Sequence, residues 1–470
     1  MMREKNHGSR FTHHLGSMQL LLTTLLLVAP EWVRNVITHE KLPNVFWAEY
    51  IVWPLIQIVI VIFIVLTLVA YLTYLERKVS AFIQARLGPM RVGPWGLLQP
   101  LADGIKLLLK EDIVPIKADR AVFLIAPVIS VVAALVVLSV IPWGAGWATI
   151  ANVNIGLLFV LAVSSVGVLG LVLAGWSSNS KYSLLGALRS SAQMVSYEIG
   201  MGLSIIGALM FARTLSMSGI IDAQQTDTLW GLGYFLYQPL GVLVYLTSAL
   251  GETNRAPFDL PEAESELVAG YHTEYSGFRW ALFFMAEYAS MIVTAAVAVT
   301  VFFGGWYFPG LGLVKNPTLY VFLSVVIYAL KIAALLYAYM WFRWTWPRYR
   351  YDQLMELGWK WMIPAGLANI VLTGVWYVLA LPKAQGGVFG LMHEEKGRLI
   401  PTKFSGIAYF VVTGLFVTIP IVWGLLANIN RRSRDFNLHE QRQLQMQLRR
   451  ERLEKMLQQP ASSQATEGVQ

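Results

Sequence analysis

The sequence contains no cysteine among its 470 residues. This absence excludes disulfides, iron-sulfur clusters and thiol catalysis, and no short cluster of its seven histidines suggests a metal or haem site. Charged residues are also scarce, at 14% of the chain against 56% hydrophobic residues. Because the apolar residues come in long runs, the composition excludes a soluble domain and predicts an all-α polytopic membrane protein.

A nucleotide-binding fingerprint is also missing, since no glycine-rich turn joins a strand to a helix. The formal charge of +8 could suggest nucleic acid, but the Lys and Arg residues cluster in loops beside apolar runs. That distribution is typical of membrane-protein topology. We therefore expect no binding of NADH or nucleic acid, and any electrons must come from the cofactor of another protein.

Windows of about 20 apolar residues recur along the chain and predict about nine transmembrane helices. The expected ranges are 53–74, 121–142, 153–175, 190–212, 229–250, 280–303, 319–342, 362–381 and 404–427. Loops on one side carry sixteen Lys and Arg residues and loops on the other carry six. The first set includes the loop after the fifth helix, and we expect it to be cytoplasmic.

Four regions follow from these helices. Residues 1–52 form an N-terminal extension whose apolar run, 20–29, is short for a span; we read it as a retained interfacial segment, with a signal-type segment or an overextended start as alternatives. Residues 53–381 form a membrane domain of eight helices. Residues 382–430 form an outer loop and the ninth helix, and 431–470 a basic cytoplasmic tail.

The stretch 251–288 holds seven of the chain's 28 acids and only two bases. Three of these acids, Glu262, Glu264 and Glu266, fall within five residues, so repulsion between their carboxylates would help to keep a proton on at least one of them. Pro257 and Pro261 predict a segment in which the helix is broken. At membrane depth, non-helical backbone is tolerated only where it is buried in protein or faces a wet cavity. The pattern favours a folded acidic loop that handles protons; a solvated loop between two helices is the alternative.

Three predicted membrane helices each carry an ionisable residue at some depth, namely Glu198, Glu287 and Lys331. A charge there costs roughly 3 kcal/mol on insertion scales, so each should face protein or water. A structural ion pair of Lys331 with Glu198 or Glu287 is the plain alternative. Such pairing is compatible with a proton relay, because relays need coupled partners.

The loop after the first helix is the second informative stretch. Two Gly-Pro pairs predict turns, and after Pro100 the apolar residues fall on one helical face. We expect an amphipathic helix along the membrane surface, and an ordinary amphipathic connector is the alternative. Further on, the alternating bases and aromatic rings of WFRWTWPRYRYDQLM are explained by anchoring at the membrane interface.

The run ETNRAPFDLPEAESELVAGYHTEYSG resembles the signature of the H subunit of proton-pumping NADH:quinone oxidoreductase, respiratory complex I, whose mitochondrial counterpart is NADH dehydrogenase subunit 1. The likeness covers roughly residues 53–381, and PRYRYDQLM resembles a second block of that family. Where the family usually has Asn, this sequence has Met90, which puts a local loop contact in doubt.

The resemblance implies a membrane subunit that forms the quinone chamber at the junction with the peripheral arm and couples quinone reduction to proton translocation. Proton transfer is expected at Glu198, Glu252, Glu262, Glu264, Glu266 and Glu287. The chamber is expected to be lined or tuned by Arg77, Arg91, Asp103, Arg255 and Arg279.

The same resemblance implies ubiquinone or menaquinone as substrate, with no flavin, iron-sulfur cluster or metal held by this chain. Its partners would be the lipid bilayer and other complex I subunits of the membrane arm and of the peripheral quinone site, in a bacterial inner membrane. Alone, the chain should have no dehydrogenase activity. The alternatives are a membrane subunit of an energy-converting hydrogenase or other electron-carrier:quinone oxidoreductase, an ion transporter, and a structural anchor.

Overall fold

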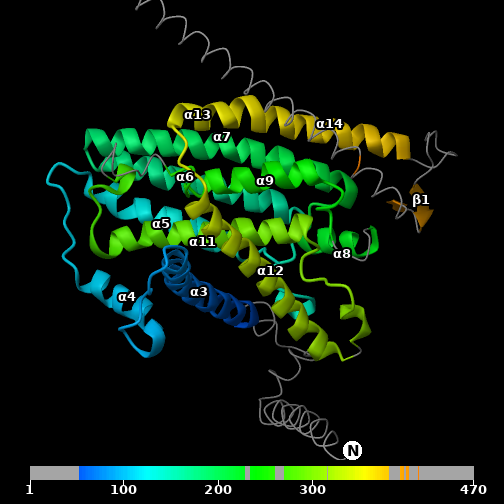
Figure 1. Ribbon diagram of the computed structural model, residues 1–470, viewed down its shortest axis with the longest axis horizontal. Coiled ribbons are helices and arrows are strands. Elements are labelled where there is room, and N and C mark those ends of the chain that lie inside the picture. Colours follow the sequence, from blue (N-terminus) through cyan, green and yellow to red (C-terminus); the bar gives the residue numbers. More distant parts are fainter. Residues whose placement is uncertain are drawn as a thin grey trace, which may run out of the picture. The chain divides into compact units, whose positions relative to one another are not determined.

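The computed structural model describes residues 52–227, 233–259, 269–314, 316–380, 392–395, 398–401 and 411. The chain divides into two compact units, Met1–Phe410 and Val411–Gln470. Except for Val411, every described residue belongs to the first unit, which is a bundle of long helices (Figure 1). The predicted ninth helix, 404–427, lies outside the described residues apart from that valine.

Within the described ranges, seven helices are long and apolar enough to cross a membrane. They are α3 (Trp53–Ile83), α5 (Arg120–Val137), α6 (Gly156–Ser177), α7 (Lys181–Ala212), α11 (Gly277–Phe302), α12 (Pro317–Thr345) and a continuous last helix. This last one consists of α13 (Tyr351–Glu356), a π-helical turn η7 (Leu357–Met362) and α14 (Ile363–Ala380). The prediction of an all-α polytopic membrane protein is confirmed.

The predicted extent of the fifth helix was wrong. Instead of spanning 229–250, α9 is the 14-residue helix Pro239–Glu252, and a buried turn containing Tyr234 and Tyr237 precedes it. Fourteen residues rise about 21 Å, less than the ~30 Å hydrocarbon core. The turn is apolar because its tyrosines pack in the core, so hydropathy alone does not reveal where the helix begins.

Shorter elements connect the long helices. The predicted amphipathic helix is present as α4 (Gln99–Leu109), in which Leu101, Leu108 and Leu109 are exposed. Helix α8 (Met217–Asp227) lies near the other end of the bundle. Single 3-10 turns occur at η2 (Pro94–Gly96), η3 (Gly146–Ala148), η5 (Gly270–His272) and η6 (Leu311–Leu313). The strands β1 (Met392–Glu395) and β2 (Arg398–Pro401) form an antiparallel hairpin with Met392 opposite Pro401.

The centre of the bundle is α11, in which every residue from Met291 to Phe302 is buried. Alanines at 295, 296 and 298 let neighbouring helices approach closely, as small residues do in membrane interfaces. Helices α3, α5, α9 and α12 all pack against it. A polar side chain within this buried part of α11 therefore faces other protein.

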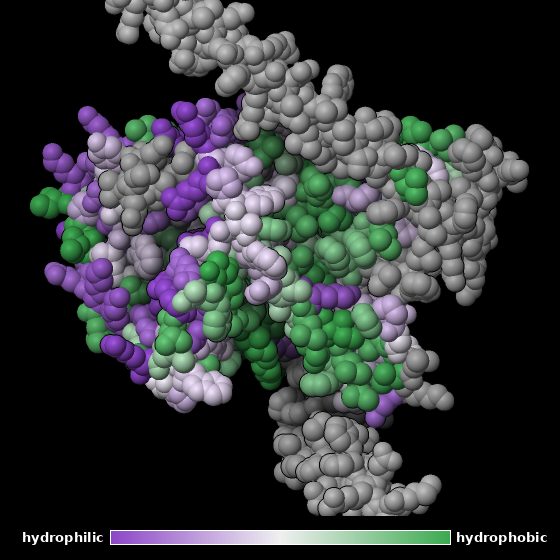
Figure 2. Space-filling view, in the orientation of Figure 1, coloured by the Kyte–Doolittle hydropathy of each residue, from purple (hydrophilic) through white to green (hydrophobic). Residues whose placement is uncertain are grey.

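One end of the bundle collects polar residues. Helices α3, α9 and α12 end there and α5, α7, α11 and α13 begin there, on the left of Figure 1. Figure 2 shows hydrophilic side chains gathered at this end and apolar side chains along the middle of the bundle. We call it the site end, because the loop after α9, which carries predicted site residues, lies there.

Candidate functional site

The described start of the loop after α9, as far as Asp259, folds into the protein, whereas Pro261 and the rest of 260–268 lie outside the described residues. Thr253 to Phe258 are all buried, and the Ala256–Pro257 peptide bond is cis. From α7, the Gln193 side-chain amide donates hydrogen bonds to the carbonyls of Gly251 (2.9 Å) and Phe258 (2.8 Å). One α7 residue thus fixes both ends of the turn and satisfies carbonyls that would otherwise be buried without donors.

Aromatic packing holds the same loop from the other side. The Phe258 ring lies 5.5 Å from that of Tyr197 on α7 and 5.8 Å from that of Tyr349, which follows α12. The Tyr349 backbone N–H donates to the Pro257 carbonyl at 3.1 Å. The block PRYRYDQLM therefore does more than anchor the chain at an interface, because it also covers the acidic loop.

Glycine permits a close approach where the loop returns to the bundle. A Cβ atom on Gly186 of α7 would lie 2.6 Å from the Cα of Gly270, a separation that real Cβ atoms essentially never show. This backbone contact seats η5 against α7. It places Tyr271 and His272 next to the start of α11.

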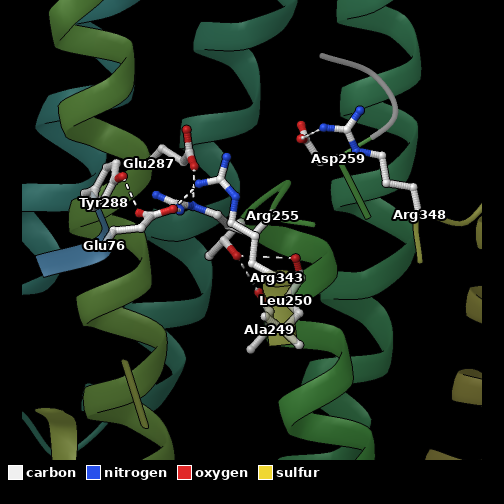
Figure 3. Close-up of polar contacts among 10 residues, drawn as sticks. Glu76, Ala249, Leu250, Arg255, Asp259, Glu287, Tyr288, Arg343 and Arg348 are labelled. Carbon is white, nitrogen blue, oxygen red and sulfur yellow. Dashed lines mark hydrogen bonds and ion pairs between the residues drawn. The ribbon is translucent and has the colours of Figure 1, made fainter. Parts of the chain in front are cut away.

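Arg255 occupies the centre of the site end, between two acids from different helices. Its Nη1 lies 2.8 Å from both carboxylate oxygens of Glu76 on α3, and its Nε lies 2.6 Å from Oε1 of Glu287 on α11. Figure 3 shows the guanidinium group between these two carboxylates. Arg255 is 7% exposed and Glu76 5% exposed, so the pair is shielded from bulk water.

Two further side chains complete this cluster. Arg343, near the end of α12, pairs with the same Glu76 carboxylate, and the Tyr288 hydroxyl donates to Glu76 at 2.5 Å. The guanidinium carbon of Arg255 lies 4.2 Å from the centre of the Tyr288 ring, a cation–π distance. We call Glu76, Arg255, Glu287, Tyr288 and Arg343 the Arg255 cluster.

The sequence pattern singled out Arg255 and Glu287 but not Glu76 and Arg343. Glu76 lies in the last turns of α3, where YLERK looks like the polar end of a membrane helix, and Arg343 lies in a run typical of interfacial anchoring. One available signal was that each of these charges lies inside the helix, before its last residue. A charge there costs free energy unless it has a partner.

Asp259 forms a separate pair beside the cluster. Its carboxylate lies 3.4 Å from Nη2 of Arg348, and Figure 3 shows this pair apart from Arg255. Burial raises the pKa of Asp259 above its ordinary value, although Arg348, Arg343 and Arg255 all favour the charged form. The charge of the Asp259 carboxyl group therefore depends on the balance between its burial and the three neighbouring arginines.

Two cavities meet at the site end. The first is lined by Arg255, Asp259, Glu287 and Arg343 together with four aromatic side chains and His272. We call it the aromatic cavity; its rings are Tyr271, Trp280, Phe283 and Phe284. Its combination of flat apolar walls and a few converging charges is typical of a small-molecule site.

The second cavity extends among α5, α6, α9 and α11. We call it the acid cavity, because Glu252 and Glu287 both line it. Hydroxyl and amide groups line it as well, from Ser130, Ser164, Thr253, Asn254, Ser290 and Thr294. Glu287 and Asn254 line both cavities, so each stands at the boundary between them.

Glu198 approaches the same interior from α7. It lies close enough to Glu252 for their charges to interact. The three membrane carboxylates chosen from the sequence, Glu198, Glu252 and Glu287, therefore converge on one region. Among the described residues, Oε2 of Glu252 has no hydrogen-bond partner.

Known proteins match most of the described helical bundle. The sequence profile of the NADH dehydrogenase family matches residues 56–374. The H subunit of NADH-quinone oxidoreductase from Rhodospirillum rubrum is 50% identical over 332 residues, covering 70% of this chain and 96% of the relative. One from Koribacter versatilis, numbered H 2, is 48% identical over 352 residues, covering 71% of this chain and 99% of that protein. The chain belongs to the H-subunit family of NADH-quinone oxidoreductase.

In this member of the H-subunit family, the first-loop residues chosen from the sequence lie apart from the Arg255 cluster. Arg77 on α3 pairs with Asp103 on α4 at 2.7 Å, and Arg91 is exposed in the intervening loop. Arg279, in the first turn of α11, pairs at 2.8 Å with Asp112 and lines neither cavity. These pairs tie the first loop to the bundle, and the expected role of the residues in the chamber stays a prediction.

The three clustered acids, Glu262, Glu264 and Glu266, lie in 260–268, outside the described residues. Their predicted role in proton transfer therefore stays a prediction. Within the described part of the chain, no group of three or more His, Asp or Glu side chains could hold a metal ion. The seven spans and membership of the H-subunit family make the chain an integral membrane protein.

The proposed ion pair of Lys331 with Glu198 or Glu287 was wrong. The Lys331 ammonium group donates instead to the carbonyls of Phe303 (2.7 Å), Gly305 (2.9 Å) and Tyr307 (2.7 Å). These three carbonyl groups lie just after the end of α11. Carbonyl groups at a helix C-terminus lack intrahelical hydrogen-bond donors and interact favourably with a cation. Lys331 thus caps α11, and Glu287 pairs with Arg255.

Replacing Lys331 by methionine should destabilise the protein by about 2–4 kcal/mol, because three carbonyls in an apolar setting lose a charged donor. Heating the detergent-solubilised complex and following the aggregation of this chain by immunoblot measures the effect. Lys360→Met is the matched control. Lys360 is 70% exposed on its side chain and pairs with the exposed Glu356, so its loss should change stability by less than about 0.5 kcal/mol. Equal midpoints for the two variants would contradict the capping role.

His272 adds a pH-dependent contribution to stability. It packs against the rings of Tyr271 and Trp280, and burial lowers its pKa from 6.5 to about 4. Between these values the unfolded chain binds more protons than the folded one, so stability is highest above pH 6.5 and falls by about 3 kcal/mol as the pH drops to 4. His272→Gln should flatten this fall in thermal midpoints measured from pH 7 to 4. An unchanged slope would contradict the buried neutral imidazole.

Proposed function

We propose that this chain forms part of the quinone-binding chamber where the membrane arm of complex I meets its peripheral arm, and that it couples quinone reduction to proton translocation. One observation carries the proposal. The aromatic cavity and the acid cavity share Glu287, whose carboxylate is held by the central cation Arg255. A change of charge in the first cavity can therefore alter protonation in the second.

The aromatic cavity suits a planar, weakly polar ring. Trp280 and Phe284 stack 5.2 Å apart along its wall, and Arg255 and Arg343 supply positive charge. Reduction of a quinone adds electrons, and the product needs two protons. Negative charge that forms ~5 Å from a carboxylate interacts with it by about 3 kcal/mol at an effective dielectric of 20. That is enough to raise the proton affinity of the carboxylate about a hundredfold.

Arg255 is the residue that transmits the change of charge from the aromatic cavity to Glu287. Glu76 and Glu287 share it, so a negative charge in the aromatic cavity, which Arg255 lines, competes with both acids for one guanidinium group. Weaker pairing with Arg255 makes Glu287 a better proton acceptor. From Glu287 the acid cavity, lined by hydroxyl groups, leads to Glu252 and on to Glu198.

Electrons in this scheme come from other subunits, because the chain has no cysteine and no nucleotide-binding fingerprint. The partners are the remaining subunits of the oxidoreductase, and the acceptor is a membrane quinone. We place the complex in a bacterial inner membrane with the site end on the cytoplasmic side. The excess of Lys and Arg in the loops at that end supports this orientation.

Photoaffinity labelling of the intact complex with an azido-quinone tests the proposal. Label is expected on the wall of the aromatic cavity, at Trp280 or Phe284, and an excess of unmodified quinone should suppress it. Trp280→Leu should move or weaken the label, whereas Trp361→Leu, an exposed residue near the start of the last helix, should leave it unchanged. Specific, competed label that reaches only other subunits would refute a chamber built by this chain.

A further inference from the structure

His272 lines the aromatic cavity, but the proposed transfer of charge does not use it. The residue ends the turn η5 and is partly buried. The centre of its ring lies 4.9 Å from that of Tyr271 and 6.4 Å from that of Trp280, both in edge-to-face arrangements. The imidazole is therefore packed against two rings of the cavity wall.

The backbone that carries the imidazole is fixed on both sides. The Ser183 hydroxyl of α7 donates to the Tyr271 carbonyl at 2.9 Å, and the Tyr275 N–H donates to the His272 carbonyl at 3.1 Å. The close approach of α7 to Gly270 holds the start of the same turn. A side chain on such a fixed turn loses little conformational freedom when a ligand binds to it.

The charged groups that line the aromatic cavity already have protein partners. Three of them belong to the Arg255 cluster, and the fourth, Asp259, pairs with Arg348. By contrast, none of the described residues forms a hydrogen bond or an ion pair with the His272 imidazole. In this part of the chain, the two ring nitrogens are therefore available to a ligand in the cavity.

The imidazole is neutral at physiological pH, because burial lowers the pKa of His272 from 6.5 to about 4. A neutral imidazole offers one N–H donor and one nitrogen acceptor. It can therefore donate to a carbonyl oxygen without adding a positive charge beside Arg255 and Arg343. The oxygen of a quinol hydroxyl group also accepts hydrogen bonds, so the same donor suits the ligand before and after reduction.

We propose that His272 binds the quinone head group by donating a hydrogen bond from its imidazole N–H to one of the two quinone carbonyl oxygens. The inference rests on the proposed function and concerns only how the head group is held, so no covalent bond changes. The hydrogen bond places the ring against the Trp280 wall, in the cavity that Arg255 also lines. Negative charge that forms on reduction then arises close to this cation.

The next residue along the turn provides a structural contrast. The Thr273 hydroxyl donates to the Gly270 carbonyl at 2.6 Å, and Thr273 does not line the aromatic cavity. Its polar group is used within η5 itself. Thr273→Val is therefore a matched control, because it removes a hydrogen bond from the same turn and leaves the cavity wall in place.

The test compares His272→Leu, His272→Gln and Thr273→Val in the assembled complex, with a short-chain benzoquinone as acceptor. His272→Leu should raise the KM for the quinone roughly three- to tenfold, because one neutral hydrogen bond is lost. Its kcat should stay within about twofold of the wild type, because the bond is made equally in the ground state and the transition state. Thr273→Val should lower the thermal midpoint and leave the KM unchanged.

His272→Gln should restore the wild-type KM to within about twofold, because glutamine keeps an N–H donor. Infrared difference spectra of the complex, with quinone labelled with ¹³C at one carbonyl at a time, give a direct readout. In the wild type and in His272→Gln, one carbonyl band should lie at lower wavenumber than in the free quinone. In His272→Leu this band should return towards the free position. A KM for His272→Gln as high as that for His272→Leu would refute the hydrogen bond.

Photoaffinity labelling separates the two possible failures. If His272→Leu keeps the wild-type KM and carbonyl bands while azido-quinone still labels Trp280 or Phe284, the role of His272 is wrong and the proposed function stands. If competed label also reaches only other subunits, both proposals fail. A His272→Leu variant that loses thermal stability as Thr273→Val does, with wild-type carbonyl bands, would make His272 a structural residue and overturn the inference.

Discussion

Replacing Arg255 by methionine is expected to abolish quinone-linked turnover of the assembled complex. The change leaves Glu76 and Glu287 facing each other in a buried site without the cation that holds both. Breaking a buried ion pair from one side typically costs 3–5 kcal/mol, which is a factor of about 100 or more in an equilibrium. The measurement is NADH-driven quinone reduction, normalised to electron transfer to an artificial acceptor that bypasses the quinone.

A matched arginine provides the control for Arg255. Arg350 is 80% exposed on its side chain and lies 3.6 Å from Asp352, so Arg350→Met should leave turnover and assembly close to wild type. Arg255→Lys is a useful intermediate, because one ammonium group cannot hold two carboxylates in the geometry of a guanidinium fork. Arg255→Met with normal quinone turnover would remove the central cation from the mechanism.

A Glu76→Gln substitution should be nearly as damaging, although no motif in the sequence points to a role for this residue. Glu76 accepts hydrogen bonds from Arg255 and Tyr288 and pairs with Arg343. In the Glu76→Gln variant, Glu287 is the remaining acid of the cluster for the guanidinium groups of Arg255 and Arg343. The new side-chain N–H₂ group would also face one of these two guanidinium groups. We expect at least a tenfold loss of quinone turnover, from a penalty of about 2–3 kcal/mol.

For Glu76 the control is Glu356→Gln, which removes the carboxylate of the exposed ion pair between Glu356 of α13 and Lys360 of η7. It should change turnover by less than about twofold. The double variant Glu76→Gln with Arg343→Met restores the balance of charges and should recover part of the turnover lost by Glu76→Gln alone. A double variant as poor as the sum of the two single ones would show that Glu76 and Arg343 act independently.

The membrane character and the position of the site could be predicted because both are local in sequence. Long apolar runs identify spans, and the concentration of acids in 251–288 identified Arg255, Glu252 and Glu287. Glu76 is separated from Arg255 by 179 residues and from Arg343 by 267. Periodicity shows which face of a helix is apolar, but it does not show which helices are neighbours.

Two errors have a common physical origin. Hydropathy reports that a residue avoids water, and it does not report whether the backbone is helical, so the buried turn before α9 was predicted as helix. Likewise, the charge of Lys331 suggested an acidic partner, whereas backbone carbonyls after α11 satisfy it. In a membrane, free backbone groups compete for charged side chains as effectively as carboxylates do.

In the proposed mechanism, Glu287 transmits a change of charge from the aromatic cavity to the acid cavity. The most direct measurement is the number of protons translocated per two electrons by a Glu287→Gln complex in proteoliposomes, at matched assembly. Quinone reduction is expected to become slow, and the proton-to-electron ratio of the remaining turnover is expected to fall below that of the wild type. Wild-type turnover with the wild-type ratio would contradict it.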